Sequence, residues 1–245
     1  MSATIRFRNF IPRPNCWREF LRVRVIRHYV AFARFFYYVI LKRKMRTFQT
    51  PDAAQNTVSH NMKSISNLSV ERSLSLIRPL ASISRVNAES KILTIGPRTE
   101  GEILNLLSFG FRRSNIKALD LISYSPWVLL GDMHQMPFSD EEFDVCLSGW
   151  VLAYSDNKKR AAEEMVRVSR NGAIVAIGVA YTPLTKQEIV NKVGYLPGSE
   201  ERMRSLKDVL KWFGPHVGTI FFQQDVDEKN ENTEFNLIVI FSIKK

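Results

Sequence analysis

Short apolar runs alternate with amphipathic stretches from residue 91 onward. Five runs have the look of buried strands, each closed by a turn or a polar residue: 91–95, 116–121, 128–130, 143–148 and 173–179. Apolar residues at helical spacing predict helices over 100–109 and 157–169, the second ended by Asn171-Gly172. Because the strands are apolar on both faces, we predict an α/β fold: a Rossmann-like, doubly wound, mostly parallel sheet with helices on both sides.

The residues after the fifth run are expected to complete this sheet. The pattern over 183–215 is helical around Leu206, Val209 and Trp212. Residues 225–234 are polar and acidic and predict an exposed loop, and 235–243 alternate with strong β-formers, which predicts a late strand.

The first 80 residues follow a different pattern. Residues 15–44 contain no Gly or Pro and predict one or two helices with recurring arginines. Residues 47–67 are rich in Ser, Thr, Asn and Gln and predict a linker, and a short helix is expected around 68–80. We therefore expect a helical arm over 1–46, a linker over 47–67 and an α/β domain over 68–245.

Charge separates the arm from the domain. The chain has a net charge of +11; residues 1–46 hold twelve Lys or Arg against one acid, whereas the remaining residues hold 23 of each sign. The basic character therefore belongs to the arm, and the domain has no excess charge to attract a polyanion.

The arm admits three interpretations. The apolar stretch over 29–41 is too short for a membrane-spanning helix, which needs about 20 residues. Residues 15–44 could lie on an anionic membrane surface, pack against the domain or a partner subunit, or contact RNA through Arg and aromatic side chains. Nucleic acid is disfavoured because the domain itself is neutral. The pattern does not fix the oligomeric state.

The two cysteines, Cys16 and Cys146, match no zinc or redox spacing. Cys146 lies in an apolar strand-like run and is expected to be a buried free thiol. A reducing compartment fits this usage, so we expect a cytoplasmic protein, peripheral at a membrane if the arm binds lipid.

Short sequence motifs resemble those of one family with this fold. In class I S-adenosylmethionine-dependent methyltransferases similar to methyltransferase type 11, a characteristic stretch lies between the third and fourth strands. This chain has a stretch that resembles it: Gly131-Asp132-Met133-His134-Gln135-Met136-Pro137-Phe138, followed by Phe143-Asp144-Val145. The segment 167–172 resembles the helix end before their fifth strand. The resemblance covers about 90 residues and implies S-adenosylmethionine as cofactor.

The resemblance also implies roles for particular side chains. Asp120, at the end of the second strand, corresponds to the carboxylate that binds both ribose hydroxyls. Asp132 corresponds to the acid that accepts a bond from the adenine amino group, and Met133 would offer its backbone N–H to the ring. Gly149 lies where the fourth strand opens onto cofactor and substrate. Each acid could instead be an ordinary loop carboxylate that caps a turn.

The first loop departs from the family pattern. Thr94 stands where the family has an acid, and Gly96 is kept, but Arg98 and Glu100 replace later glycines. Side chains there would crowd a cofactor lying against the turn. Alternatively, Glu100 and Glu102 could bind the cofactor's amino group, and Arg98 could pair with the cofactor's carboxylate or with a neighbour such as Glu102. In a loop that has lost the cofactor, these side chains would be surface charges.

The chemistry expected of an active enzyme is a single in-line methyl transfer, which needs mainly positioning and sometimes a base. His134, Trp150 and Tyr154 are the candidates for the catalytic region, with Asp156 a weaker base. The methyl acceptor is not identified by the sequence. The alternative is a catalytically inactive methyltransferase fold that serves as a binding or assembly module anchored by its arm.

Overall fold

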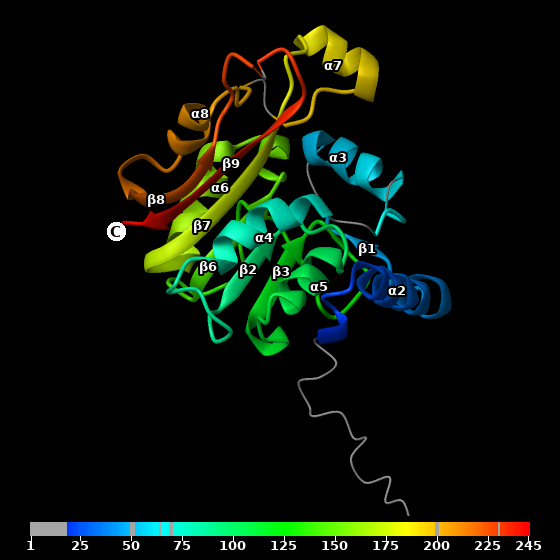
Figure 1. The fold of residues 1–245 in the computed structure, drawn as a ribbon. Coiled ribbons are helices and arrows are strands. Elements are labelled where there is room, and N and C mark those ends of the chain that lie inside the picture. The colour runs from blue at the N-terminus through cyan, green and yellow to red at the C-terminus, as the bar shows by residue number, and fades with distance from the viewer. Residues whose placement is uncertain (1–18, 50–51, 64, 69–70, 199–200, 230) are drawn as a thin grey trace, which may run out of the picture.

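Seven strands form the central sheet of the computed structural model, which describes residues 19–49, 52–63, 65–68, 71–198, 201–229 and 231–245. The strands lie in the order β5-β3-β2-β6-β7-β9-β8 (Figure 1). Their bounds are β2 Ile92–Ile95, β3 Ile116–Asp120, β5 Leu129–Leu130, β6 Phe143–Gly149, β7 Ser169–Tyr181, β8 Val217–Gln224 and β9 Phe235–Ile243. β9 pairs antiparallel with both neighbours, whereas the pairs from β5 to β7 are parallel.

Alternation along the strands builds two cores. Ile92 and Val145 belong to one apolar cluster, while their sequence neighbours Leu93 and Cys146 belong to the other, as the two-residue period of a strand requires. Both faces are thus buried, and the predicted doubly wound, mostly parallel sheet is confirmed.

Helices cover both faces of this sheet (Figure 1). α4 (Leu74–Ala81) and α5 (Gly101–Ser108) contribute to the first core, and α6 (Lys158–Val168) and α8 (Leu206–Leu210) contribute to the second. α7 (Lys186–Val193) follows β7. Single turns of 3-10 helix occur at Glu71–Ser73 (η2), Arg113–Asn115 (η3), Leu152–Tyr154 (η4) and Gly214–His216 (η5).

Two boundaries differ from the sequence prediction. α6 ends at Val168 and β7 begins at Ser169, so Asn171-Gly172 lies inside the strand and does not end the helix. Gly172 has φ +78° where the pairing of β6 with β7 changes register. The region 183–215 holds two short helices, and β8 was not predicted because its residues are mostly exposed and lack a clear alternation.

The segment 47–67, predicted as a linker, contains regular secondary structure. Residues Arg46–Thr47 form β1, which pairs antiparallel with β4 (Ile122–Ser123), and Asp52–Lys63 form the helix α3. The polar composition of this segment hid the helix, and the pairing of β1 with β4 is a tertiary contact that no local pattern reveals.

The described part of the arm is helical and packs on the domain; residues 1–18, which include Cys16, lie outside the described residues. α2 (Arg24–Phe35) continues into a π-helical stretch, η1 (Phe36–Leu41). Leu21 and Ala31 are buried in the first core, and Val30 and Phe35 pack against it. Among the described residues, no helix has the length and apolarity needed to cross a membrane.

Cys146 is a free thiol buried in β6, as predicted. Burial raises the pKa of this thiol to about 12, so it stays protonated near neutral pH and is unreactive.

Candidate functional site

A cavity of about 330 Å³ opens at the carboxyl ends of the parallel strands. The loop after β2, the end of β3, the loop after β5 and the end of β6 all contribute to its wall, together with α3 and η2. This volume lies within the roughly 300–1,000 Å³ of small-molecule sites, and the position is where open α/β sheets bind their ligands.

The first loop has two residues in the left-handed conformation, Gly96 and Arg98, of which only one is a glycine. Gly96 has φ +67°, and a Cβ there would lie 2.5 Å from Val151 Cγ2, so only glycine fits. Arg98 has φ +56°, a left-handed conformation that glycine adopts more readily, and its backbone N–H donates to Asp120 Oδ2 at 2.5 Å. The side chain of Arg98 lines the cavity without filling it.

Asp120 ends β3 and faces the cavity. Its two oxygens accept hydrogen bonds from the backbone N–H groups of Arg98 and Ile122. Burial raises the pKa of Asp120 to about 6, although these N–H groups and the charge of Arg98 favour the ionised form. A carboxylate offers about four lone-pair sites; the backbone N–H of Leu121 also favours the ionised form, and lone-pair capacity remains for a hydroxyl donor.

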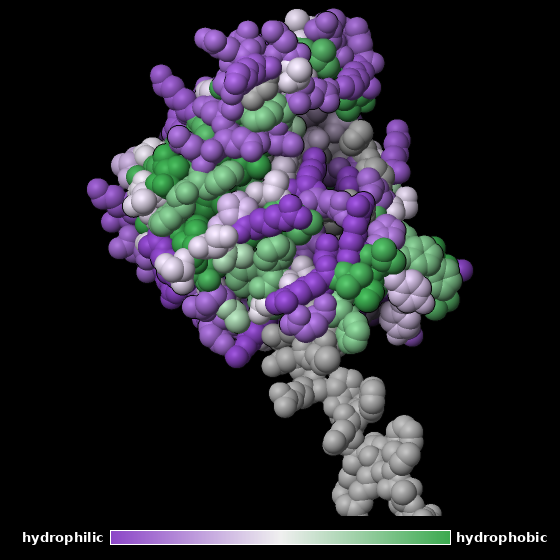
Figure 2. Space-filling view, in the orientation of Figure 1, coloured by the Kyte–Doolittle hydropathy of each residue, from purple (hydrophilic) through white to green (hydrophobic). Residues whose placement is uncertain are grey.

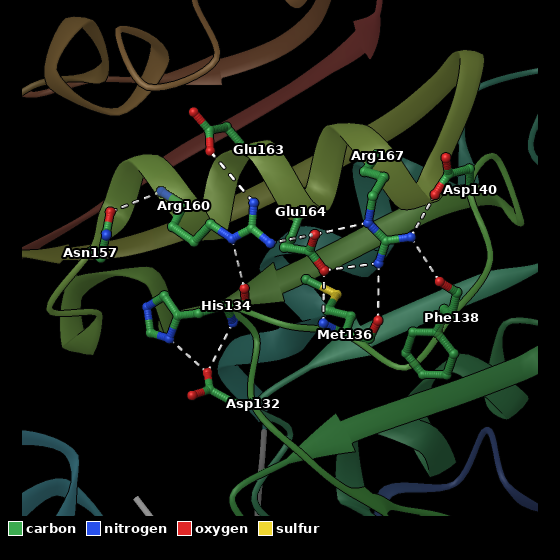
Figure 3. A network of polar contacts seen from close by, with 10 residues as sticks. All are labelled: Asp132, His134, Met136, Phe138, Asp140, Asn157, Arg160, Glu163, Glu164 and Arg167. Carbon is green, nitrogen blue, oxygen red and sulfur yellow. Dashed lines mark hydrogen bonds and ion pairs between the residues drawn. The ribbon is translucent and has the colours of Figure 1, made fainter. Parts of the chain in front are cut away.

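Asp132 is held by the histidine two residues later (Figure 3). Asp132 Oδ1 accepts from the His134 backbone N–H at 2.9 Å and lies 2.6 Å from His134 Nδ1, which lowers the pKa of Asp132. The other oxygen, Oδ2, has no partner among the described residues. One oxygen therefore fixes the side chain while the other stays available to a donor in the cavity.

His134 is engaged at both ring nitrogens. Nε2 lies 2.7 Å from Ser155 Oγ and 3.4 Å from Asp156 Oδ1. Burial alone would lower the pKa of His134, but the hydrogen bond and the charge of Asp132, with a smaller contribution from Asp156, raise it. This environment suits a residue that orients Asp132 better than one that abstracts a proton.

Glu102 brings a second buried carboxylate to the cavity from the first turn of α5. It accepts a hydrogen bond from the Thr94 hydroxyl in β2, and its Oε2 would lie 3.0 Å from a Cβ at Gly149. Burial raises the pKa of Glu102 to about 7. The carboxylate thus lies next to Thr94, the position where the family pattern has its acid.

Glu100 differs from the prediction. It does not line the cavity; its fully buried carboxylate forms a two-pronged ion pair with Arg34 of α2, one contact being Nη2 to Oε1 at 2.8 Å. The Arg34 guanidinium also stacks on Trp127, 3.6 Å from the ring centroid. Glu100 therefore anchors the arm and does not contact the cavity.

Trp150 forms the wall at the end of β6. It has φ +62°, its backbone N–H donates to the Gly178 carbonyl, and its Nε1 donates to Asn236 Oδ1 at 2.8 Å. A Cβ at Gly178 would lie 3.2 Å from the indole ring, so the missing side chain makes room for Trp150. Tyr154 lines the cavity beside it.

The structure brings together most of the residues predicted from the sequence. The cavity wall contains Gly96, Arg98, Asp120, Asp132, Met133, His134, Gly149, Trp150 and Tyr154. Sequence reasoning missed Arg72 of η2 and the α3 residues Thr57, Val58 and Asn61. No signal marked them, because they precede the family-like segment and lie in or near the polar stretch interpreted as a linker.

Comparison with known proteins finds a family match in the middle of the chain. Residues 110–177 match the sequence model of the methyltransferase-domain family. An uncharacterised protein of Methanocaldococcus jannaschii is 38 % identical over 52 residues, which are 21 % of this chain and 25 % of that protein. The chain thus spans about a quarter of the length of this relative.

Two solved structures share the fold. The MccD protein superposes with a TM-score of 0.55 at 13 % identity, over 69 % of this chain and 96 % of that one. The N-methyltransferase NodS from Bradyrhizobium japonicum, solved with S-adenosylhomocysteine, gives a TM-score of 0.51 at 16 % identity, over 76 % of this chain and all of that one. At these identities the likeness concerns the fold.

Proposed function

We propose that the chain is a class I methyltransferase, which transfers a methyl group from S-adenosylmethionine to an acceptor; the fold and the family match over residues 110–177 support this. One observation carries the proposal: Asp120 and Asp132, from the ends of two neighbouring strands, face one open cavity of suitable volume. The cofactor supplies the electrophilic methyl group, and the protein supplies position.

The residues present fit the nucleoside half of this cofactor. Asp120 has lone pairs left for the ribose hydroxyls, and Asp132 has a free Oδ2 for the adenine amino group. Met133, whose backbone N–H would be offered to the adenine ring, lines the same cavity. His134 holds Asp132 in the ionised state that an amino donor requires.

The methionine half of the cofactor would lie against the first loop, whose residues differ from the family pattern but still offer suitable charges. Glu102 takes the place of the acid missing at Thr94 and is the group that would bind the ammonium. Arg98 is the group that would bind the carboxylate. Both side chains line the cavity, so a changed first loop is compatible with a zwitterionic ligand.

Tyr154 and Asp156 are the candidates for handling the acceptor's proton, since both line the cavity after β6. His134 serves as a positioning residue, because Asp132 and Ser155 occupy its ring nitrogens. The open cavity favours this function over an inactive binding module, in which no room for adenosine would be needed.

Calorimetry with S-adenosylhomocysteine tests the cofactor site. Asp120→Asn and Asp132→Asn should each weaken binding by roughly 10- to 100-fold, since a hydrogen bond to a charged group contributes about 1.5–3 kcal/mol. Asp140→Asn is the matched control, because Asp140 is exposed, pairs with Arg167 and lies outside the cavity. Unchanged affinity in either cavity variant contradicts that residue's role.

We also propose that the arm binds an anionic membrane surface while it stays docked on the domain. Its outward face carries exposed apolar side chains at helical spacing: Val25, Tyr29, Phe32, Phe36 and Ile40, between 44 % and 74 % exposed. Figure 2 shows this apolar area over α2. The exposed cations Lys42, Arg43 and Lys44 follow it.

The two faces of the arm have separate tasks in this proposal. Arg34 and Ala31 hold the inner face against the domain, which supports the interpretation that the arm packs on it. The outer face combines apolar side chains with flanking cations, the composition of helices that lie in the headgroup region. Packing on the domain and binding lipid are therefore compatible.

A further inference from the structure

A second, larger cavity lies on the far side of Trp150. Its volume is about 580 Å³, and it shares Arg72, Trp150 and Tyr154 with the cofactor cavity. The end of β7, the helix α7 with the loop that follows it, and the start of β9 form most of the remaining wall, to which Ala153 of η4 and Lys158 of α6 also contribute. The two cavities therefore adjoin at three side chains.

Most of the second cavity's wall is apolar or aromatic. The side chains concerned include Tyr181, Leu184, Ile189, Val193, Leu196 and Phe235. Such a wall favours an organic molecule with a sizeable apolar body over a sugar or a free amino acid.

The charged side chains of this wall mostly have protein partners. Lys192 pairs with Glu234, and Glu201 pairs with Lys211. Arg202 donates to the carbonyls of Leu184 and Thr182 at 2.5 and 2.7 Å. Lys158 donates to the Ser155 carbonyl at 3.1 Å.

Arg72 is the exception. Its guanidinium lies over the Trp150 ring, 4.7 Å from the centroid, and it forms no ion pair with a carboxylate of the described residues, although Glu102 attracts it over a longer distance. The side chain is exposed at the junction of the two cavities. A guanidinium in this state presents its fork of N–H donors to an incoming anion.

We infer that the second cavity is the acceptor site, and that the acceptor is an amphipathic organic anion whose carboxylate or phosphate binds Arg72 and whose apolar part lies against the α7 wall. The inference rests on the proposed function, since it assigns the substrate class of the same enzyme. Arg98 and Glu102 already offer charges to a zwitterionic cofactor, which leaves Arg72 for a second ligand.

Binding of eight-carbon probes to the full chain saturated with S-adenosylhomocysteine tests this inference. Octanoate carries a carboxylate and octyl phosphate carries a phosphate, and 1-octanol is the uncharged control with the same number of carbons. We expect at least one anion to bind tenfold or more tightly than 1-octanol. Arg72→Gln should remove this preference, leaving binding of 1-octanol within twofold of wild type.

Lys192→Gln is the matched control, because Lys192 lines the same cavity but is paired with Glu234; its anion affinity should stay within twofold. The inference is overturned if neither anion is preferred to 1-octanol, or if Arg72→Gln leaves the preference intact. It is also overturned if Arg72→Gln abolishes binding of S-adenosylhomocysteine, because Arg72 then belongs to the cofactor. Wild type that binds no S-adenosylhomocysteine refutes the proposed function separately.

Discussion

Glu102 and Thr94 show how one site can keep its chemistry while its residues change place. The strand position holds a hydroxyl, and the carboxylate comes from the first turn of α5, eight residues later. Carboxylates are also favoured at this end of a helix by the helix dipole. The price of this arrangement is burial, which raises the pKa of Glu102 to about 7.

This pKa gives a pH dependence with a defined sign. Glu102 is protonated below about pH 7, and only its ionised form attracts an ammonium group. Affinity for S-adenosylhomocysteine should therefore rise between pH 6.5 and 8, by up to tenfold per pH unit below the pKa. Asp120, with a pKa of about 6, is mostly ionised throughout this range.

Calorimetry at several pH values on wild type and Glu102→Gln measures the effect. The variant should bind more weakly at pH 8 and show a flatter profile. Because its folded pKa is raised, Glu102 also binds a proton on folding between about pH 4.5 and 7, so its contribution to stability falls as pH rises through that window. Parallel affinity profiles for the two proteins would exclude Glu102 from the cofactor site.

At the scale of elements, the arm and the first loop meet in one contact. The ion pair of Arg34 with Glu100 joins α2 to the start of α5, and Phe35 packs edge-on against Tyr124, whose hydroxyl accepts from the Glu100 backbone N–H. Glu100 is fully buried, so removing Arg34 would leave an uncompensated charge. The arm is thus part of the structure behind the cofactor loop.

The membrane proposal concerns the outer face of this same element. Phe32→Ser with Phe36→Ser should abolish or strongly reduce flotation of the full chain with vesicles that contain anionic lipid, because it removes two stacked, exposed rings. Phe109→Ser is the control, since Phe109 is also an exposed phenylalanine (39 %) but lies outside the arm. Flotation that survives the double substitution would refute lipid binding by α2.

Local pattern predicted those elements whose burial is regular. The strands β2, β3 and β6 and the helices α5 and α6 match their predicted ranges closely, because their apolar residues repeat with the period of the element. α3 and β1 were hidden in a polar segment. The start of β7 was also misjudged, because Asn171-Gly172 forms a positive-φ irregularity within a strand.

The sequence predicted those residues of the site that lie at or just after the end of a strand. Asp120, Asp132 and Gly149 lie where neighbouring strands terminate, so the sheet's topology brings them to one edge. Arg72 and the α3 wall come from outside this repeating plan. The sequence did not reveal the role of Glu100, because its ion-pair partner, Arg34, is 66 residues away in sequence.

At the scale of the molecule, one mostly parallel sheet presents two adjoining cavities separated by Trp150, with the arm packed behind the first loop. The core clusters fix the strands, and the strands fix where the loops converge. The binding of the eight-carbon probes tests the proposed substrate class, and vesicle flotation tests membrane binding by the arm.

Hydrogen exchange of the full chain with and without S-adenosylhomocysteine tests the central claim most directly. Bound ligand should slow exchange in four separate segments, 96–102, 120–122, 131–134 and 149–151, because all four line one cavity or adjoin it. The edge strand β8 lies at the far end of the sheet and should exchange at an unchanged rate. Exchange that is unaltered in those four segments would contradict the assignment of this cavity to the cofactor.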